Sequence, residues 1–437
     1  MASPLTPFLA VREAAQRLQG NASDYDPLLH MAHGKDIVLL GEATHGTAEF
    51  YRMRAQITQA LVRGQGFDAV AIEGDWPDAW RVNRYVQGEG DDSAEQALSD
   101  FERFPSWMWR NREFLAFIEW LRGHNAGLPP ERRVGVYGLD LYSLYRSAEA
   151  VIRYLQRADP VQAETARQHY AALDHVRDPA AYGYQAATGL RAPARDGAIR
   201  QLLQLRNDEA AYISRNGLAG MDSHYFAERN ATVVVNAEAY YREMFGRRVS
   251  TWNLRDAHMA QTLSSLATYR LRRGGSGRIV VWAHNSHLGD ARATESQLRG
   301  EWNLGQLVRQ QAGAQALLVG FTTYTGHVCA ASEWDGDPEH KAVVPALHDS
   351  WEALFHSTGL DCFFLPLGPQ ASHPLFEVML ERAIGVLYLP RTERASHYFD
   401  ASIAGQFDAL FHLDETTALE PLQPGHPVPA LGSGRPD

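Results

Sequence analysis

Short apolar runs alternate with longer helical patterns along most of the chain. The helical spacing is clear after residue 47, where Phe50, Met53, Ile57 and Leu61 recur on one face of a predicted helix. Such alternation is typical of parallel βα units. We therefore predict an α/β fold with a central, mostly parallel sheet flanked by helices. The predicted strands are residues 36–40, 67–72, 133–138, 278–282, 315–321, 384–389 and 407–412.

One long region departs from this alternation. Residues 145–272 show successive helical patterns without strand-like runs, and we interpret them as a large helical insertion or lid over a cleft at the strand ends. After the strand at 315–321, an alternating stretch with Gly326 predicts a hairpin that turns at this glycine. The tail is rich in proline and glycine and is predicted to be disordered. The expected divisions are an N-terminal α/β half (1–144), the insertion (145–272), a C-terminal α/β half (273–422) and the tail (423–437).

A carboxylate and an imidazole occupy the turn between the first predicted strand and its helix. The stretch Gly41-Glu42-Ala43-Thr44-His45-Gly46 begins where the apolar run 36–40 stops. A histidine accepts a proton near neutral pH when a carboxylate fixes its tautomer and stabilises the cation. Glu42 or Glu73 would supply that carboxylate for His45. A structural alternative is that both side chains only cap the turn.

A second strand-to-helix turn carries two more imidazoles. His284 and His287 follow the predicted strand 278–282. They would supply a second acid or base, an oxyanion donor or metal ligands, unless they are hydrogen-bonded core residues. Because the carboxyl ends of parallel strands share one edge of the sheet, the two turns predict one assembled site.

Other polar and aromatic residues are candidates for binding substrate. Glu73 and Asp75 close the second strand, where the alternative is a solvated acidic turn. Trp107 and Trp109 would line an apolar cleft, although packing is the commoner role of such residues. Arg255 would stabilise developing negative charge or form a structural ion pair with the neighbouring aspartate.

Composition narrows the class of protein. The chain has 437 residues, a formal net charge of −11 and only two cysteines. Net acidity without a basic cluster argues against a nucleic-acid partner, and the absence of a disulfide framework favours the cytoplasm. No leader pattern and no run of about 18 apolar residues is present, so we expect no membrane partner. No Gly-x-Ser-x-Gly elbow, phosphate-binding loop or dinucleotide fingerprint occurs, which removes support for serine-hydrolase, nucleotide and nicotinamide chemistry.

Taken together, several motifs resemble the erythromycin esterase family. They are Gly41–Gly46, Glu73-Gly74-Asp75-Trp76-Pro77, Trp107-Met108-Trp109-Arg110-Asn111, Trp252-Asn253-Leu254-Arg255-Asp256, Ala283-His284-Asn285-Ser286-His287 and Ser396-His397-Tyr398-Phe399. The resemblance implies opening of a macrolide lactone, or hydrolysis of another small-molecule ester, by activated water without a covalent intermediate and without a metal.

The resemblance also implies roles for individual residues. His45 would be the general base, with Glu42 and Glu73 orienting the imidazole or the water. Arg54, His284 and His287 would bind the carbonyl or protonate the leaving alkoxide. Arg52 is not distinguished from Arg54, and both are expected on faces of their helix other than the apolar stripe.

Two alternatives follow from the same residues. One is a metal-dependent hydrolase in which His45, His284 and His287 are ligands. The other is a module that binds a hydrophobic or polyhydroxylated ligand without turnover. The esterase hypothesis requires no cofactor.

Overall fold

A nine-stranded sheet with mostly parallel neighbours forms the centre of the molecule. The computed structural model describes residues 6–174, 176, 178–245, 248–368 and 374–422. The strand order is β1-β8-β11-β6-β2-β5-β3-β4, and β7 pairs with β6. The strands of this sheet are β1 (Gln16–Arg17), β2 (Ile37–Leu40), β3 (Ala69–Asp75), β4 (Gly135–Asp140), β5 (Ile279–Trp282), β6 (Ala316–Ala330), β7 (Glu339–Val343), β8 (Cys362–Pro366) and β11 (Ala409–Thr416).

Parallel pairing runs without interruption from β11 through β6, β2, β5 and β3 to β4. The pairs of β8 with β11, β1 with β8 and β6 with β7 are antiparallel. A separate two-stranded sheet joins β9 (Val378–Arg382) to β10 (Tyr398–Ser402). The α/β fold with a mostly parallel sheet is therefore confirmed. The carboxyl ends of β2, β3, β4 and β5 lie at one edge, which is where the polar strand-end residues collect.

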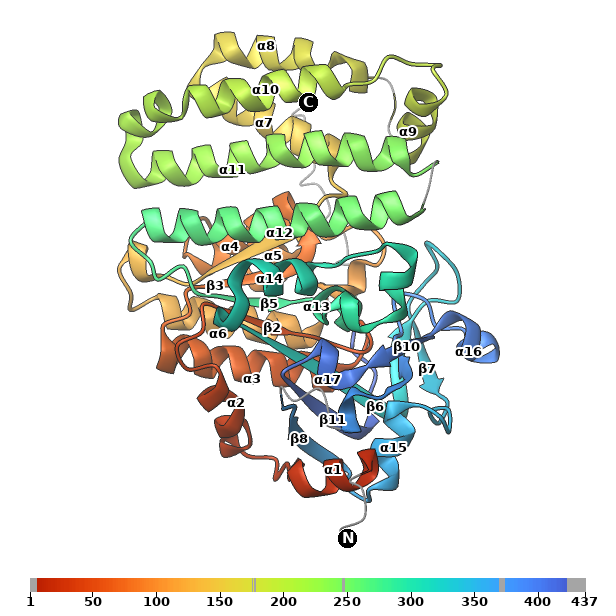
Figure 1. The fold of residues 1–437 in the computed structure, drawn as a ribbon. Helices are drawn as coiled ribbons and strands as arrows, with labels where there is room; N and C mark the ends of the chain where they lie inside the picture. The colour runs from red at the N-terminus through yellow and green to blue at the C-terminus, as the bar shows by residue number, and fades with distance from the viewer. Residues whose placement is uncertain (1–5, 175, 177, 246–247, 369–373, 423–437) are drawn as a thin grey trace, which may run out of the picture.

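Helices cover both faces of the sheet (Figure 1). The first group is α1 (Pro7–Ala14), α2 (Asp26–Met31), α3 (Ala48–Gln65), α4 (Trp76–Val86), α5 (Ala94–Leu98) and α6 (Arg112–Asn125). The second group is α7 (Leu144–Ala158), α8 (Pro160–Tyr170), α9 (Pro179–Ala187), α10 (Arg195–Asn207), α11 (Glu209–Glu243) and α12 (Arg248–Arg272). The third group is α13 (Asn285–Leu288), α14 (Leu304–Ala312), α15 (Trp351–Ser357), α16 (Glu393–Ser396) and α17 (Ile403–Gln406).

The second group of helices lies between β4 and β5 in the sequence. In Figure 1, α7, α8, α10 and α11 stack in a layer at the top, and α12 lies between that layer and the sheet. No strand occurs among the described residues of this group. The last helix of the group, α12, leads into β5 in the middle of the sheet. Residues of α12 can therefore reach the strand ends.

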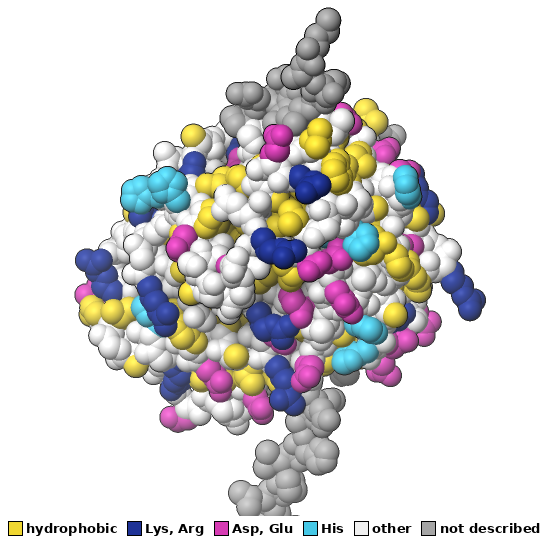
Figure 2. Space-filling model, turned by 90° about the horizontal axis from the view of Figure 1, so that it is seen from below, with side chains coloured by type: hydrophobic (Ala, Val, Ile, Leu, Met, Phe, Trp, Pro, Cys, Tyr) yellow, Lys and Arg dark blue, Asp and Glu magenta, His cyan; other side chains and the backbone are white. Residues whose placement is uncertain are grey.

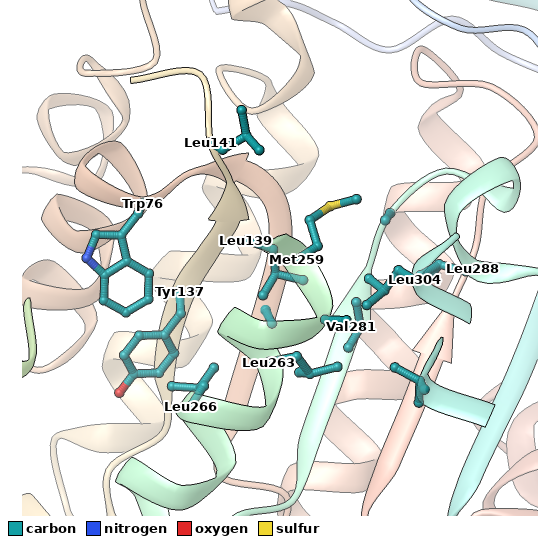
Figure 3. Packing of buried hydrophobic residues seen from close by; sticks show 14 of the residues in the cluster. Trp76, Tyr137, Leu139, Leu141, Met259, Leu263, Leu266, Val281, Leu288 and Leu304 are labelled. Atoms are coloured by element: carbon teal, nitrogen blue, oxygen red, sulfur yellow. The ribbon is translucent and has the colours of Figure 1, made fainter. Parts of the chain in front are cut away.

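Alternation along the strands divides most of the apolar core into two large clusters, one on each face of the sheet. Val281 packs with Leu263, Leu266 and other side chains beneath α12 (Figure 3). Val280 and Trp282 point to the opposite face and pack with α3 and α6. Because successive strand side chains point to opposite faces, a fully apolar strand indicates a sheet covered on both sides.

The predicted helix after the first turn is confirmed as α3. It ends at Gly66, which has a positive φ of 69°. Arg54 differs from the expectation, because it lies on the buried stripe and is fully buried, four residues after Phe50. Arg52 is half exposed and pairs with Glu49 at 2.5 Å.

Two sequence predictions about the C-terminal half are wrong. Residues 384–389 form only isolated bridges, Thr44 to Ile384 and Ala331 to Leu387, because this segment crosses the end of the sheet beside the first turn. Gly326 is not a turn, since β6 continues to Ala330. A Cβ at Gly326 would lie 2.1 Å from the carbonyl oxygen of Thr416 in β11, so close strand approach explains this glycine.

The described surface has no strongly basic face in the view of Figure 2, where acidic and basic side chains are interspersed with apolar ones. Within the described ranges, no helix combines the length and apolar character needed to cross a membrane. The predicted disordered tail, 423–437, lies outside the described residues.

Candidate active site

The first turn holds a histidine–carboxylate–arginine chain. The Nδ1 atom of His45 lies 2.9 Å from Oε1 of Glu42, and Arg54 donates a 2.5 Å hydrogen bond to Oε2 of Glu42. The Arg54 guanidinium lies over the rings of Tyr51 and Trp282, 4.4 and 5.0 Å from their centroids. Glu42 and Arg54 are fully buried, while His45 is 6% exposed. The carboxylate binds Nδ1 and leaves Nε2 of His45 available for chemistry.

Two glycines let the first turn pack against its neighbours. A Cβ at Gly41 would lie 2.1 Å from Oδ1 of Asn285, and one at Gly46 would lie 1.8 Å from the carbonyl oxygen of Cys329. The backbone N–H of Asn285 donates to the carbonyl of Glu42 at 2.8 Å. The two strand-end turns are therefore bonded directly to each other, as the sequence predicted from the sheet edge.

His284 presents an unpaired ring nitrogen. Its Nδ1 accepts a hydrogen bond from the backbone N–H of Ser286 at 3.2 Å, so the neutral ring carries its proton on Nε2. Burial and the neighbouring His45 lower the pKa of His284 to about 3. Its Nε2 is buried and has no hydrogen-bond partner among the described residues. The ring centroids of His45 and His284 are 4.9 Å apart. His284 is thus a neutral donor placed beside the His45 imidazole.

Glu73 is held as a carboxylate between three donors. Its Oε1 accepts from Arg255 at 2.8 Å, and its Oε2 accepts from the backbone N–H of His284 at 2.9 Å. The Nε2 of His287 lies 3.4 Å from Oε1. Burial alone would raise the pKa of Glu73, but the charges of His287 and Arg255 outweigh it and hold that pKa below its usual range.

Arg255 joins the insertion to two strands. From α12 it makes a bidentate pair with Asp140 at the end of β4, with Nε to Oδ1 at 3.0 Å and Nη2 to Oδ2 at 2.6 Å. It also reaches Glu73 on β3 and lies over the Tyr142 ring at 5.1 Å from the centroid. Arg255 therefore fixes the positions of two carboxylates that the sequence places far apart.

His287 forms the second histidine–carboxylate pair. Its Nδ1 lies 2.9 Å from Oδ1 of Asp256, and the Trp252 ring stacks on it at 4.6 Å with 10° between the planes. Burial opposes protonation of His287, but Asp256 and Glu73 outweigh it, so the pKa of His287 is raised. Its Nε2 accepts from Arg255 at 3.0 Å when neutral and faces Glu73 when protonated.

Asp256 is the principal residue that sequence analysis did not select. The sequence suggested it only as a structural partner of Arg255, but Arg255 pairs with Glu73 and Asp140, and Asp256 pairs with His287. The helix crosses the strand ends closely enough for both side chains to reach inward. The available signal was its place in the motif Trp252-Asn253-Leu254-Arg255-Asp256, directly after Arg255.

Five of the predicted site residues, together with Trp252, line one cavity of about 370 Å³. They are His45, Glu73, Trp252, Arg255, His284 and His287. The opposite wall comes from η6 (Glu295–Arg299) and from the segment around β10, including His397, Phe399 and Gln406. Four distant parts of the chain thus enclose the three imidazoles.

The remaining predicted residues lie outside this cavity. Asp75 pairs with Arg103 at 3.2 Å, and burial raises the pKa of Asp75. Trp107 and Trp109 are 2% and 3% exposed, and Trp109 donates to the backbone carbonyl of Glu73 at 2.9 Å. Arg52 lines a separate surface hollow beside α3. The two tryptophans therefore support the site from outside the cavity. Arg52 makes no contact with the cavity.

The three histidines and their carboxylates do not form a metal-binding arrangement. Within the described residues, no group of three or more histidine, cysteine, aspartate or glutamate side chains is placed to hold a metal ion. Each of His45 and His287 instead gives Nδ1 to a carboxylate. These histidine–carboxylate pairs are suited to proton transfer.

Comparisons with known proteins place the chain in a family. A family model described as erythromycin esterase matches residues 62–416. The chain is 20% identical to erythromycin esterase type II of Escherichia coli over 421 residues, covering 92% of this chain and 94% of that protein. It is also 20% identical to the putative hydrolase YbfO of Bacillus subtilis, covering 91% of this chain and 88% of that protein.

Solved structures share the fold. A crystal structure of a succinoglycan biosynthesis protein superposes with a TM-score of 0.76 and 23% identity, covering 94% of this chain and 97% of that chain. A mutant of erythromycin esterase EreC in its open conformation has a TM-score of 0.65 and 16% identity, covering 91% and 94%.

Proposed function

The chain belongs to the erythromycin esterase family, and from this premise we propose that it hydrolyses carboxylic esters by direct attack of water. Family membership supports a hydrolase acting on a small molecule. The ester bond, the catalytic residues and the attack by water are the parts that we propose. One observation carries the proposal: a carboxylate-paired His45 and a neutral His284 face the same cavity.

In the proposed reaction, His45 is the general base. Its Nε2 accepts a proton from water while Glu42 stabilises the resulting imidazolium through Nδ1. The water oxygen attacks the ester carbonyl carbon and forms a tetrahedral intermediate. Arg54 holds Glu42 in place and does not reach the cavity, so we assign it a positioning role.

His284 is the proposed oxyanion donor. A neutral imidazole with its proton on an unpaired Nε2 can donate to the carbonyl oxygen as negative charge develops there. Its low pKa prevents it from competing with His45 as a base near neutral pH. His45 has a carboxylate at Nδ1 and His284 does not, so the two imidazoles are assigned different roles, base and donor.

His287 is the proposed acid for the leaving alkoxide. Asp256 favours its protonated form, and Glu73 accepts from the same Nε2 in the resting site. When the tetrahedral intermediate collapses, the carbon–oxygen bond to the alcohol breaks and the alkoxide takes the proton from His287. The products are a carboxylic acid and an alcohol. Arg255 then hydrogen-bonds to the neutral Nε2 until the proton is restored from His45 through water.

The cavity volume bears on the substrate. A volume of about 370 Å³ lies near the lower end of the range for drug-sized ligands, roughly 300–1,000 Å³. We therefore propose esters of moderate size as the first substrate class to test. Hydrolysis of a macrolide lactone, which is larger, would require the cavity to widen.

The decisive experiment compares wild type with His45→Ala on a panel of carboxylic esters and on erythromycin, with and without a chelator. We expect ester cleavage that resists the chelator and falls by about 10²–10⁴-fold in His45→Ala. His356→Ala is the control, because His356 also pairs with a carboxylate, Asp414, but lies outside the cavity. Ester cleavage that His45→Ala leaves unchanged would remove His45 from the mechanism.

A further inference from the structure

A second and larger cavity lies between the insertion and the sheet domain. Its volume is about 950 Å³, and it shares no lining residue with the ester cavity. One wall is α4, which follows β3, and the other is α7, which begins the insertion. We call this cavity the arginine cleft, because arginines of both helices line it.

Arginines recur at helical spacing along both walls. Arg146, Arg153 and Arg157 are seven and four residues apart on α7, so they share one face of that helix. Arg81 and Arg84, three apart on α4, line the facing wall. These five arginines therefore line one cleft.

Two of these arginines are committed to carboxylates. Arg81 is bidentate to Asp92 at 2.8 and 3.0 Å, and Arg146 lies 2.8 Å from Asp78. Such close pairs fix the walls of the cleft and leave little positive charge for a ligand.

The other three arginines are weakly paired. Arg84 lies 3.6 Å from Glu89, with both side chains about half exposed, and Arg153 lies 3.4 Å from Glu149 on its own helix. Arg157 has no ion pair within the described residues. Exposed ion pairs of this kind contribute little to stability, so an anionic ligand can replace the carboxylate partners.

The floor of the cleft is aromatic. The rings of Trp80 and Phe226 stack with centroids 4.8 Å apart, and both side chains are only partly buried. Guanidinium groups above a flat apolar floor suit a ligand with several anionic oxygens and a planar portion. The lining of the cleft holds six arginines and four carboxylates, a small excess of positive charge in a chain whose net charge is −11.

We propose that the arginine cleft binds a small multivalent oxyanion of the diphosphate type, with Arg84, Arg153 and Arg157 as the binding groups. The site is separate from the ester cavity and does not depend on the proposed hydrolysis. Bidentate guanidinium–phosphate hydrogen bonds would supply the affinity, and Trp80 would contact any flat organic group that the diphosphate carries.

The test is calorimetric titration of the full chain with pyrophosphate and, separately, with adenosine diphosphate. The double variant Arg153→Gln/Arg157→Gln is expected to bind at least about tenfold more weakly, because hydrogen bonds to charged groups contribute about 1.5–3 kcal/mol each. Its melting temperature and secondary structure should match wild type, since both side chains are exposed.

The control is Arg167→Gln/Arg200→Gln, which removes the same charge from exposed positions of the insertion outside the cleft. This control should bind as wild type does. Tighter binding of adenosine diphosphate than of pyrophosphate would support contact with Trp80, and equal binding would support recognition of the diphosphate alone. The proposal would be overturned if neither probe bound at a concentration of about 1 mM, or if both double variants weakened binding equally.

Discussion

Three imidazoles at one cavity occupy three different electrostatic settings. His45 has a carboxylate at Nδ1, His284 has only neutral partners, and His287 lies between Asp256 and Glu73. Burial and the neighbouring His45 lower the pKa of His284, whereas Asp256 and Glu73 outweigh burial and raise the pKa of His287. Residue type alone therefore does not assign acid, base and donor; the partner of each ring nitrogen does.

Replacing Glu73 with glutamine tests the charge at the centre of this network. Glu73→Gln removes the negative charge that Arg255 and His287 share, and we expect kcat/KM for esters to fall by about 10²–10³-fold. Steady-state kinetics check this. Asp68→Asn is a matched control, since Asp68 is also buried beside an arginine, Arg270, but lies at the amino end of β3, away from the cavity. Equal losses in both variants would show a general effect on folding.

Asp256 permits a prediction about pH. A protonated His287 is needed as the acid, so kcat should fall as pH rises through its pKa, which lies above the ordinary value of 6.5. Asp256→Asn removes the charge that favours protonation, and the alkaline limb of the pH profile should move to lower pH by about one unit. Asp400→Asn, at an exposed position, should leave the limb in place. An unshifted limb in Asp256→Asn would contradict the acid role of His287.

At the scale of elements, the first turn depends on how closely α3 and β6 approach. Gly46 precedes α3 and faces the carbonyl group of Cys329 on β6. The backbone N–H of Cys329 donates to the carbonyl of Gly46 at 2.9 Å, so the two backbones are fixed at short range. This close contact between the two backbones fixes the direction in which the His45 side chain points.

Gly46→Ala should therefore be costly. The new Cβ would lie 1.8 Å from a backbone oxygen that cannot move without breaking the strand, and we expect a loss of about 1–3 kcal/mol in the free energy of unfolding. Chemical denaturation measures it. Gly64→Ala, in the same helix with no atom within 4 Å of the new Cβ, should instead stabilise by about 0.5–1 kcal/mol. Equal effects of the two substitutions would contradict the steric argument.

At the scale of the whole molecule, Arg255 connects the helical insertion to the sheet. It comes from the last helix of the insertion and binds carboxylates at the ends of β3 and β4. The same side chain that lines the ester cavity therefore also holds two parts of the structure together. Catalysis and the docking of the insertion should be affected by the same substitution.

Arg255→Lys keeps the charge but loses the planar fork that reaches two carboxylates. Breaking one partner of a buried ion pair costs about 3–5 kcal/mol, and we expect part of that loss together with a fall in kcat. Differential scanning calorimetry and ester kinetics on the same preparation check both. Arg292→Lys is the control, because Arg292 binds only Asp290 and is half exposed. Loss of activity without loss of stability would show that the docking role is small.

Periodicity in the sequence was enough to predict the sheet and the face of α3 because both signals are local. Strand-end residues such as Glu42, Glu73 and His284 could be assigned to one edge, since parallel strands align their carboxyl ends. Arg54 shows where the local signal was available but not used: it lies four residues after Phe50 and so belongs to the apolar stripe.

The sequence by itself determined the fold class, the α3 helix and the meeting of the two histidine turns. Only the tertiary structure decided that His287 pairs with Asp256, that Arg255 joins Glu73 to Asp140, and that residues 384–389 cross the sheet end rather than form a strand. The physical reason is range. Apolar spacing depends on neighbours within a few residues, whereas the charge beside each imidazole depends on strand order and on how α12 crosses the sheet edge.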